Sequence, residues 1–293
     1  MNEALKSALS VAISKKKGQI FNISDYRSQG GGCINEAYLV GNGTTQFFVK
    51  LNAASLLPMF EAEEAALKEL SDAHAIRVPN PISEGIASNR SYLILEALPF
   101  GTAHSGSWEK MGRQLAQLHR VTADRFGWHR NNVIGSTHQH NNWTNDWPTF
   151  FREQRLRPQF ELARQNGFHF PQAEELLGEI ESLLTGHSPS PSLLHGDLWS
   201  GNAGFLTDGT PVVFDPAAYY GDRETDLAFS EFFGGFPAAF YTAYEREWPL
   251  TTGYEKRKDL YNLYHVLNHA NLFGGGYASQ TSSMISNLLA GKP

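Results

Sequence analysis

The chain has 293 residues, of which 41% are hydrophobic and 12% aromatic, and its formal net charge is −6. This length and composition predict a globular protein with one large domain or two lobes around a cleft, and the mild acidity argues against bulk electrostatic binding to nucleic acid or anionic membranes. The single cysteine, Cys33, excludes an intrachain disulfide, and the absence of a signal-peptide pattern or long apolar run predicts a soluble cytoplasmic protein.

The first elements are a helix and a β-meander. Apolar residues recur at helical spacing over residues 2–15, and from residue 20 to 51 the pattern becomes that of strands. A bend at Gly30, Gly31 and Gly32 interrupts the strands. Without Cβ atoms, such a bend lets backbone N–H groups approach phosphate oxygens, although three glycines alone fit a plain flexible loop equally well.

Lys50 lies inside the apolar strand 47–51, and a lysine that points inward there needs a partner. The helix expected at 59–70 offers acidic candidates, namely Glu61, Glu63 and Glu64. A strand lysine paired with a helix glutamate is the arrangement by which kinases hold nucleotide phosphates. The alternative is an edge-strand lysine and a solvated acidic helix face.

A linker between two lobes is expected near residue 100. A proline-rich turn at Pro79 and Pro81 precedes the strand 91–96, and a loop with proline and glycine follows it. If the linker lies here, backbone groups near Glu96, Ala97 and Leu98 would face an adenine ring.

After residue 105 the pattern is mainly helical. Residues 126–142 are expected to form a loop. Amphipathic helices are predicted at 108–119, 146–165, 172–185, 224–233, 237–247 and 255–272.

The stretch 193–216, LLHGDLWSGNAGFLTDGTPVVFDP, carries the most specific chemistry. Asp197 and Asn202 have the spacing of a kinase catalytic loop, in which the aspartate accepts the hydroxyl proton and the asparagine holds a metal ion. Asp215 follows a strand-like run, as a metal-binding aspartate would. Each of these short patterns alone also fits an ordinary turn, but their ordered combination favours phosphoryl transfer with Mg²⁺.

These residues resemble the fructosamine-3-kinase (ketosamine kinase) family, within the aminoglycoside phosphotransferase and choline kinase-like group. The resemblance covers most of the chain, and its most specific strings are HGDLWSGN and DPAAYYG. It implies an α+β, two-lobed protein-kinase-like fold. A small β-rich lobe (1–96) and a larger, mainly helical lobe (97–293) would hold the ATP site between them.

The resemblance also implies an activity: ATP with Mg²⁺ would phosphorylate the 3-hydroxyl of ribulosamine or fructosamine adducts, free or on glycated lysines, in a deglycation role. Asp197 would be the catalytic base or orienting group. The other implied roles are phosphate binding by Lys50 paired with Glu63, Mg²⁺ binding by Asn202 and Asp215, and sugar contacts by Trp199 and His269.

Two positions leave the assignment open. Asp222 stands where the family pattern suggests histidine, and the acidic run Asp222, Glu224 and Asp226 could change the charge near the metal aspartate or suit an amine acceptor. Cys33 lies in the glycine-rich bend, so the protein is expected to be a monomer or a redox-sensitive dimer through Cys33. The competing functions are an aminoglycoside or choline-type phosphotransferase and a nucleotide-binding pseudokinase.

Overall fold

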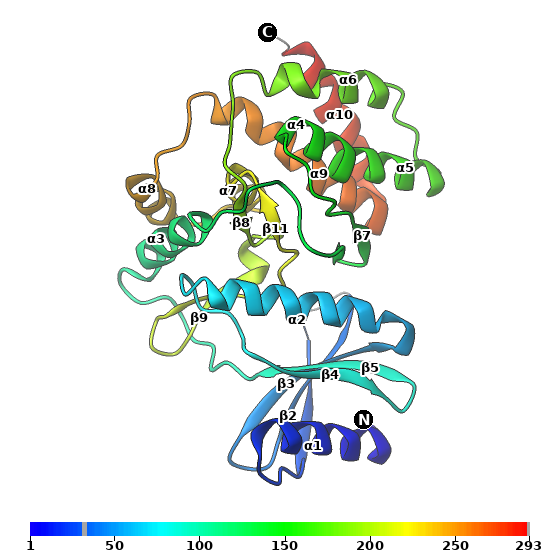
Figure 1. Cartoon of the computed structure of the whole chain (residues 1–293), viewed down its shortest axis with the longest axis vertical. Helices are drawn as coiled ribbons and strands as arrows, with labels where there is room; N and C mark the ends of the chain where they lie inside the picture. Colours follow the sequence, from blue (N-terminus) through cyan, green and yellow to red (C-terminus); the bar gives the residue numbers. More distant parts are fainter. Residues whose placement is uncertain (31–33, 292–293) are drawn as a thin grey trace. The chain divides into compact units, whose positions relative to one another are not determined.

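The computed structural model describes residues 1–30 and 34–291 (Figure 1). By backbone contacts the chain forms two compact units. The N-terminal unit comprises residues 1–104 together with 204–214, and the C-terminal unit comprises residues 105–203 together with 215–293. Within the part of the chain that the structure describes, no helix is both long and apolar enough to cross a lipid bilayer.

The N-terminal unit is built on one antiparallel sheet with the strand order β1-β2-β3-β5-β4. Its strands are β1 (Asp25–Gln29), β2 (Glu36–Gly41), β3 (Gln46–Ala53), β4 (Pro81–Ala87) and β5 (Arg90–Glu96). Helices α1 (Glu3–Lys17) and α2 (Leu57–Asp72), the latter preceded by the 3₁₀ turn η1 (Ala54–Leu56), cover opposite faces of the sheet (Figure 1).

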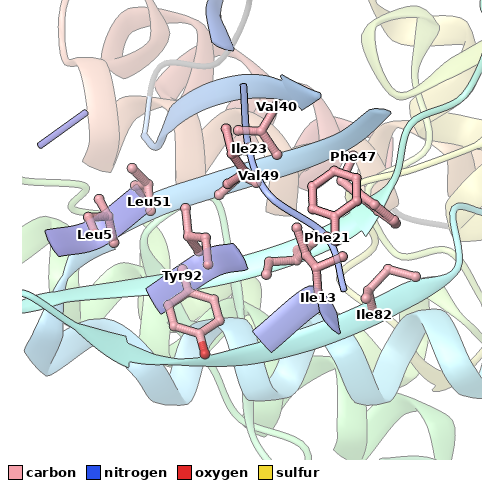
Figure 2. Packing of buried hydrophobic residues seen from close by; sticks show 12 residues of the cluster. Leu5, Ile13, Phe21, Ile23, Val40, Phe47, Val49, Leu51, Ile82 and Tyr92 are labelled. Carbon is pink, nitrogen blue, oxygen red and sulfur yellow. The ribbon is translucent and has the colours of Figure 1, made fainter. Parts of the chain in front are cut away.

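Strand β3 divides its side chains between these two helices. Successive residues of a strand point to opposite faces, so Phe47, Val49 and Leu51 join the buried cluster beneath α1 (Figure 2). Lys50 therefore projects to the other face, where α2 lies. The cluster buries Leu9 and Ile13 of α1 completely, and each such side chain contributes roughly 1.5–3 kcal/mol of transfer free energy.

The proline-rich turn predicted around Pro81 is wrong in part, because Pro81 begins strand β4. Proline is tolerated there since β4 is an edge strand and Pro81 is its first residue, so no ladder hydrogen bond is sacrificed in the interior of the sheet. Prolines are common in turns, so the sequence pattern did not indicate that a strand begins at Pro81.

Residues 204–214, which follow the predicted catalytic loop, belong to the N-terminal unit. Strands β9 (Ala203–Phe205) and β10 (Pro211–Val213) pair with each other. The Gly101 N–H donates to the Phe205 carbonyl at 2.8 Å, and the Val213 N–H donates to the Arg77 carbonyl at 3.0 Å. The chain then returns to the C-terminal unit at Asp215.

The C-terminal unit is mainly helical. Its helical elements are α3 (Ser107–His119), α4 (Trp147–Phe150), the π-helical turn η2 (Phe151–Leu156), α5 (Arg157–Gln165), α6 (Ala173–Leu183), the 3₁₀ turn η3 (Ser200–Asn202), α7 (Glu224–Phe232), α8 (Ala238–Glu247), α9 (Tyr254–Phe273) and α10 (Gly276–Ala290). Helices α3 and α8 approach closely, since a Cβ on Gly112 would lie 2.2 Å from the Phe240 carbonyl oxygen.

Two features of this unit differ from the sequence-based expectation. The predicted loop 126–142 contains a short hairpin of β6 (Asn132–Ile134) and β7 (Thr137–Gln139), and helix α10 was not predicted. Three-residue strands give too few positions for a period-2 pattern. The serine-rich sequence of α10 has a weak helical signal, and its stability comes from packing on α9 and α6.

Candidate functional site

Residues 195–202, the predicted catalytic loop, follow strand β8 (Ser192–Leu194), which pairs with β11 (Tyr219–Gly221). Its first turn requires glycine at position 196. Gly196 has φ +81°, and a Cβ there would lie 2.1 Å from the Ala217 carbonyl oxygen. Both the backbone conformation and the close approach exclude any side chain, so the sharp turn that presents Asp197 depends on this glycine.

Asp226 of α7 stabilises the same turn through hydrogen bonds to its backbone. It is buried, and its carboxylate accepts hydrogen bonds from the His195 N–H at 2.7 Å and the Gly196 N–H at 2.8 Å. His119 Nε2 donates to the same carboxylate at 3.2 Å. Burial alone would raise the pKa of Asp226, but these hydrogen bonds and neighbouring histidines outweigh it and hold the pKa below its usual value. Sequence reasoning missed this anchor.

Asp197 and Asn202 lie together. The Asn202 Nδ2 donates to the Asp197 backbone carbonyl at 2.9 Å and to Asp197 Oδ2 at 3.0 Å. Because both bonds use the amide nitrogen, the Asn202 Oδ1 is the atom that could bind a cation. The loop therefore orients an oxygen ligand and a carboxylate in one place.

Asp215 completes this acidic group. It has φ +57°, a left-handed conformation that is uncommon for residues other than glycine and that often occurs at functional sites. Burial raises the pKa of Asp197 to about 7, the Asn202 hydrogen bond opposes this rise, and the charges of Asp215 and Asp226 add to it. Carboxylates that repel one another, together with an amide oxygen, are a suitable donor set for a hard divalent cation such as Mg²⁺.

In the N-terminal unit, Lys50 and Glu63 form an ion pair. Lys50 Nζ donates to Glu63 Oε1 at 2.6 Å, and the two side chains are only 7% and 11% exposed. The structure thus selects Glu63 among the three acidic candidates on α2. Gly30 is exposed at the end of β1, whereas Gly31, Gly32 and Cys33 lie outside the described residues.

The segment predicted to face adenine follows β5. The Glu96 carboxylate is paired with Arg77 and accepts the Asn80 N–H at 3.2 Å. The Leu98 carbonyl accepts the Phe100 N–H at 3.0 Å. The backbone groups of this segment are the ones predicted to contact adenine. That contact stays a prediction.

The predicted sugar-binding residues Trp199 and His269 are connected through a third ring. Phe233, just beyond α7, lies 5.6 Å from the Trp199 ring and 5.2 Å from the His269 ring, measured between centroids. Trp199 folds back over Gly201, where a Cβ would lie 2.3 Å from the indole. Phe233 was not predicted, and its only sequence signal is its place in the string EFFGGF.

The acidic run after β11 is engaged within the protein. Asp222 accepts hydrogen bonds from His187 Nε2 at 2.6 Å and the Tyr261 hydroxyl at 2.5 Å. Arg257 binds both oxygens of Glu224, at 2.7 and 2.8 Å. His187, Asp222 and Glu224 are close enough to hold a cation, but each already has a protein partner. These carboxylates are buried and are not available to a substrate amine.

A family model described as fructosamine kinase matches residues 5–291. A probable ketoamine kinase of Synechocystis is 49% identical over 278 residues, which cover 94% of each chain. The chloroplastic protein-ribulosamine 3-kinase of Arabidopsis thaliana is 41% identical over 279 residues, covering 93% of this chain and 85% of that protein.

A crystal structure of a candidate fructosamine-3-kinase from Haemophilus somnus superimposes with a TM-score of 0.91 at 32% identity, covering 96% of each chain. Together with the antiparallel sheet and the helical C-terminal unit, this confirms the predicted α+β kinase-like fold. The match over nearly the whole length shows that the chain belongs to the fructosamine kinase family.

Proposed function

We propose that the protein is an ATP-dependent kinase that phosphorylates the 3-hydroxyl of ketosamines. The observation that carries this is the catalytic loop: Asp197 is fixed by Asn202 on one side and by the Asp226-anchored turn on the other. Ketosamine specificity is supported by the names of relatives, a protein-ribulosamine 3-kinase and a ketoamine kinase, at 41% and 49% identity.

Each proposed role follows from the chemistry of phosphoryl transfer, which needs placement and charge neutralisation. Lys50, held by Glu63, would neutralise the nucleotide phosphates. Asn202 Oδ1 and the Asp215 carboxylate would hold Mg²⁺, which shields the charge on the transferred group. Asp197, whose pKa is raised towards neutrality, would orient the acceptor hydroxyl and take its proton.

On the acceptor side, Trp199 would place its indole against the sugar, and His269 would close the same region. Glu96 and Leu98 would supply backbone contacts to adenine, and Gly30 to Gly32 would supply N–H groups to the phosphates. A dimer through Cys33 also stays a prediction, because that residue lies outside the described part of the chain.

The direct test is a phosphorylation panel. Ribulosamines and fructosamines of one alkylamine, an aminoglycoside and choline are each incubated with Mg·ATP, and products are identified by mass and by the position of the phosphate. We expect 3-phosphates of the ketosamines alone. Turnover of only the aminoglycoside or choline would favour the rival kinase, and no ATP consumption with any acceptor would favour a pseudokinase.

The matched variant is Asp197→Ala. Removing a general base typically costs about 10²–10⁴-fold in rate, so kcat should fall by that factor while the melting temperature stays close to that of the wild-type protein. Near-normal turnover of the purified variant would show that Asp197 does not carry the reaction.

A further inference from the structure

Trp199, Phe233, His269, Phe273 and Tyr277 form a connected group of rings in the C-terminal unit, here called the aromatic cluster. The rings come from the catalytic loop, the residue after α7, the end of α9 and the start of α10. Around His269 the centroid distances are 5.2 Å to Phe233, 5.7 Å to Phe273 and 5.1 Å to Tyr277.

The aromatic cluster is not a closed core. Trp199, Phe233, His269 and Tyr277 are only half-buried, and Phe273 is 54% exposed. The rings meet His269 at tilts of 49° to 54° rather than stacking face to face. Aromatic faces carry negative potential, so a partly exposed group of such rings attracts cations.

His269 adds a hydrogen-bond acceptor to this group. Its Nδ1 lies 2.8 Å from the His265 carbonyl oxygen. A carbonyl can only accept, so Nδ1 carries the hydrogen and, in the neutral ring, Nε2 carries a lone pair. Burial lowers the pKa of His269 and this hydrogen bond only partly opposes the shift, so the imidazole is neutral at pH 7.

A positively charged substrate amine therefore has few anionic partners here. The three carboxylates of the acidic run are committed: Asp222 to His187 and Tyr261, Glu224 to Arg257, and Asp226 to the turn that contains Gly196. Glu231, two residues before Phe233, accepts hydrogen bonds from Tyr254 and Lys258. Near His269, the groups described that can recognise an ammonium group are the aromatic faces and the neutral acceptor of His269.

We propose that the aromatic cluster binds the protonated secondary amine of the ketosamine. This inference rests on the proposed function and specifies how the substrate is selected. The amine is attached to C1 of the sugar, close to the reacting C3 hydroxyl, and Phe233 is the ring of the cluster that lies next to Trp199, so in the proposed pose the nitrogen lies near Phe233. The rings of Phe233, Phe273 and Tyr277 contribute cation–π attraction, and His269 Nε2 accepts an N–H hydrogen bond.

The aromatic cluster should favour a substrate with one ammonium group over an acceptor with many. A carboxylate-lined site would bind any compact polyamine, whereas an aromatic surface with one acceptor suits a single ammonium flanked by carbon substituents. The exposed Phe273 would be the last ring before the carrier of the amine, so the rest of the carrier would have little influence on binding.

The experiment compares two substrates that differ only in the atom attached to C1: the ribulosamine of a primary alkylamine, and its analogue with an ether oxygen, which has neither the positive charge nor the N–H donors. Steady-state kcat and KM are measured with wild-type protein and with Phe273→Leu and Tyr277→Leu, because Phe233 also packs against Trp199. Tyr277→Phe keeps the ring and is the matched control. Phe273→Leu changes an exposed side chain, so folding is preserved, and melting temperatures check the other variants.

We expect wild-type protein to have a lower KM for the amine than for the ether. Each ring-to-leucine change should raise the amine KM by about threefold to tenfold, with kcat and the ether KM nearly unchanged. Equal use of the two substrates, or equal losses on both, would overturn the inference and leave the kinase function standing. If wild-type protein phosphorylates neither substrate, the proposed function itself fails, and the inference with it.

Discussion

Gly201 determines where the Trp199 indole lies. The ring occupies the space that a Cβ at position 201 would fill, with the nearest ring carbons 2.3 and 2.4 Å away. The glycine therefore acts on the proposed sugar contact without touching substrate. This is a case in which the absence of a side chain positions a neighbouring one.

Gly201→Ala should push the Trp199 ring off the loop. We expect the ketosamine KM to rise about tenfold, because the loss of one aromatic contact costs about 1.4 kcal/mol. The KM for ATP should stay constant. Gly178→Ala is the control, because that helical glycine has no atom within 4 Å of an added Cβ. An unchanged ketosamine KM in Gly201→Ala would separate the Trp199 position from substrate binding.

Asp226 affects the site through its hydrogen bonds to the backbone N–H groups of His195 and Gly196. Asp226→Asn replaces one acceptor oxygen by a donor that faces the His195 or Gly196 N–H. We expect a loss of about 3 kcal/mol in the free energy of unfolding and about a 100-fold fall in kcat from the displaced loop. Asp259→Asn, on an exposed position of α9, should be neutral in both measurements.

The Asp226 contribution also depends on pH. Its pKa is lowered by folding, so the stabilisation is fully present above the unfolded-state pKa of about 4 and is lost as the pH falls through the lower folded-state pKa. Denaturant titrations should show a constant difference between wild type and Asp226→Asn from pH 8 to about 5, shrinking below about 4. A difference that disappears near neutral pH would contradict this assignment.

At the scale of elements, strand β3 connects a structural core on one face with a functional ion pair on the other. Phe47, Val49 and Leu51 pack under α1, while Lys50 reaches Glu63 on α2. The two helices therefore have different tasks: α1 stabilises the sheet, and α2 orients the lysine.

Leu9→Ala tests the structural task of α1. Leu9 is fully buried, so its truncation should cost about 2–5 kcal/mol of unfolding free energy, measured by chemical denaturation, without changing kcat of the folded protein. Val11→Ala, on the same helix at a side chain that is 65% exposed, should change stability by less than about 0.5 kcal/mol. Equal effects of the two substitutions would mean that α1 does not pack as described.

At the scale of the whole molecule, nucleotide binding should appear as added stability. Saturating Mg·ATP at about 100 times its Kd should stabilise the protein by about 2.7 kcal/mol, seen as a rise in melting temperature. Lys50→Met should lose most of this rise relative to its own ligand-free value. Lys68→Met, on α2 with a side chain 54% exposed, should show the same rise in melting temperature as the wild-type protein. A full rise in Lys50→Met would show that Lys50 does not bind the nucleotide phosphates.

Several predictions from sequence depended on short-range patterns and held for that reason. Helix α1 and strand β5 lie where apolar spacing placed them, and the Asp197–Asn202 contact is set by a tight loop between neighbouring residues. The start of strand β4 was not predicted, because Pro81 is typical of a turn. The sequence did not show which of Glu61, Glu63 and Glu64 pairs with Lys50, because that depends on which face of α2 lies against the sheet.

The reactive groups and the family could be recognised from the amino-acid sequence, because the spacing of Asp197, Asn202 and Asp215 is local and specific. The carboxylates that are already engaged could be identified only from the folded chain. Asp222, Glu224 and Asp226 look alike in the sequence, yet their partners His187, Arg257 and Gly196 lie roughly 30 residues away. Burial and partner choice arise from such long-range contacts, and those contacts separate a structural carboxylate from one that can meet a substrate.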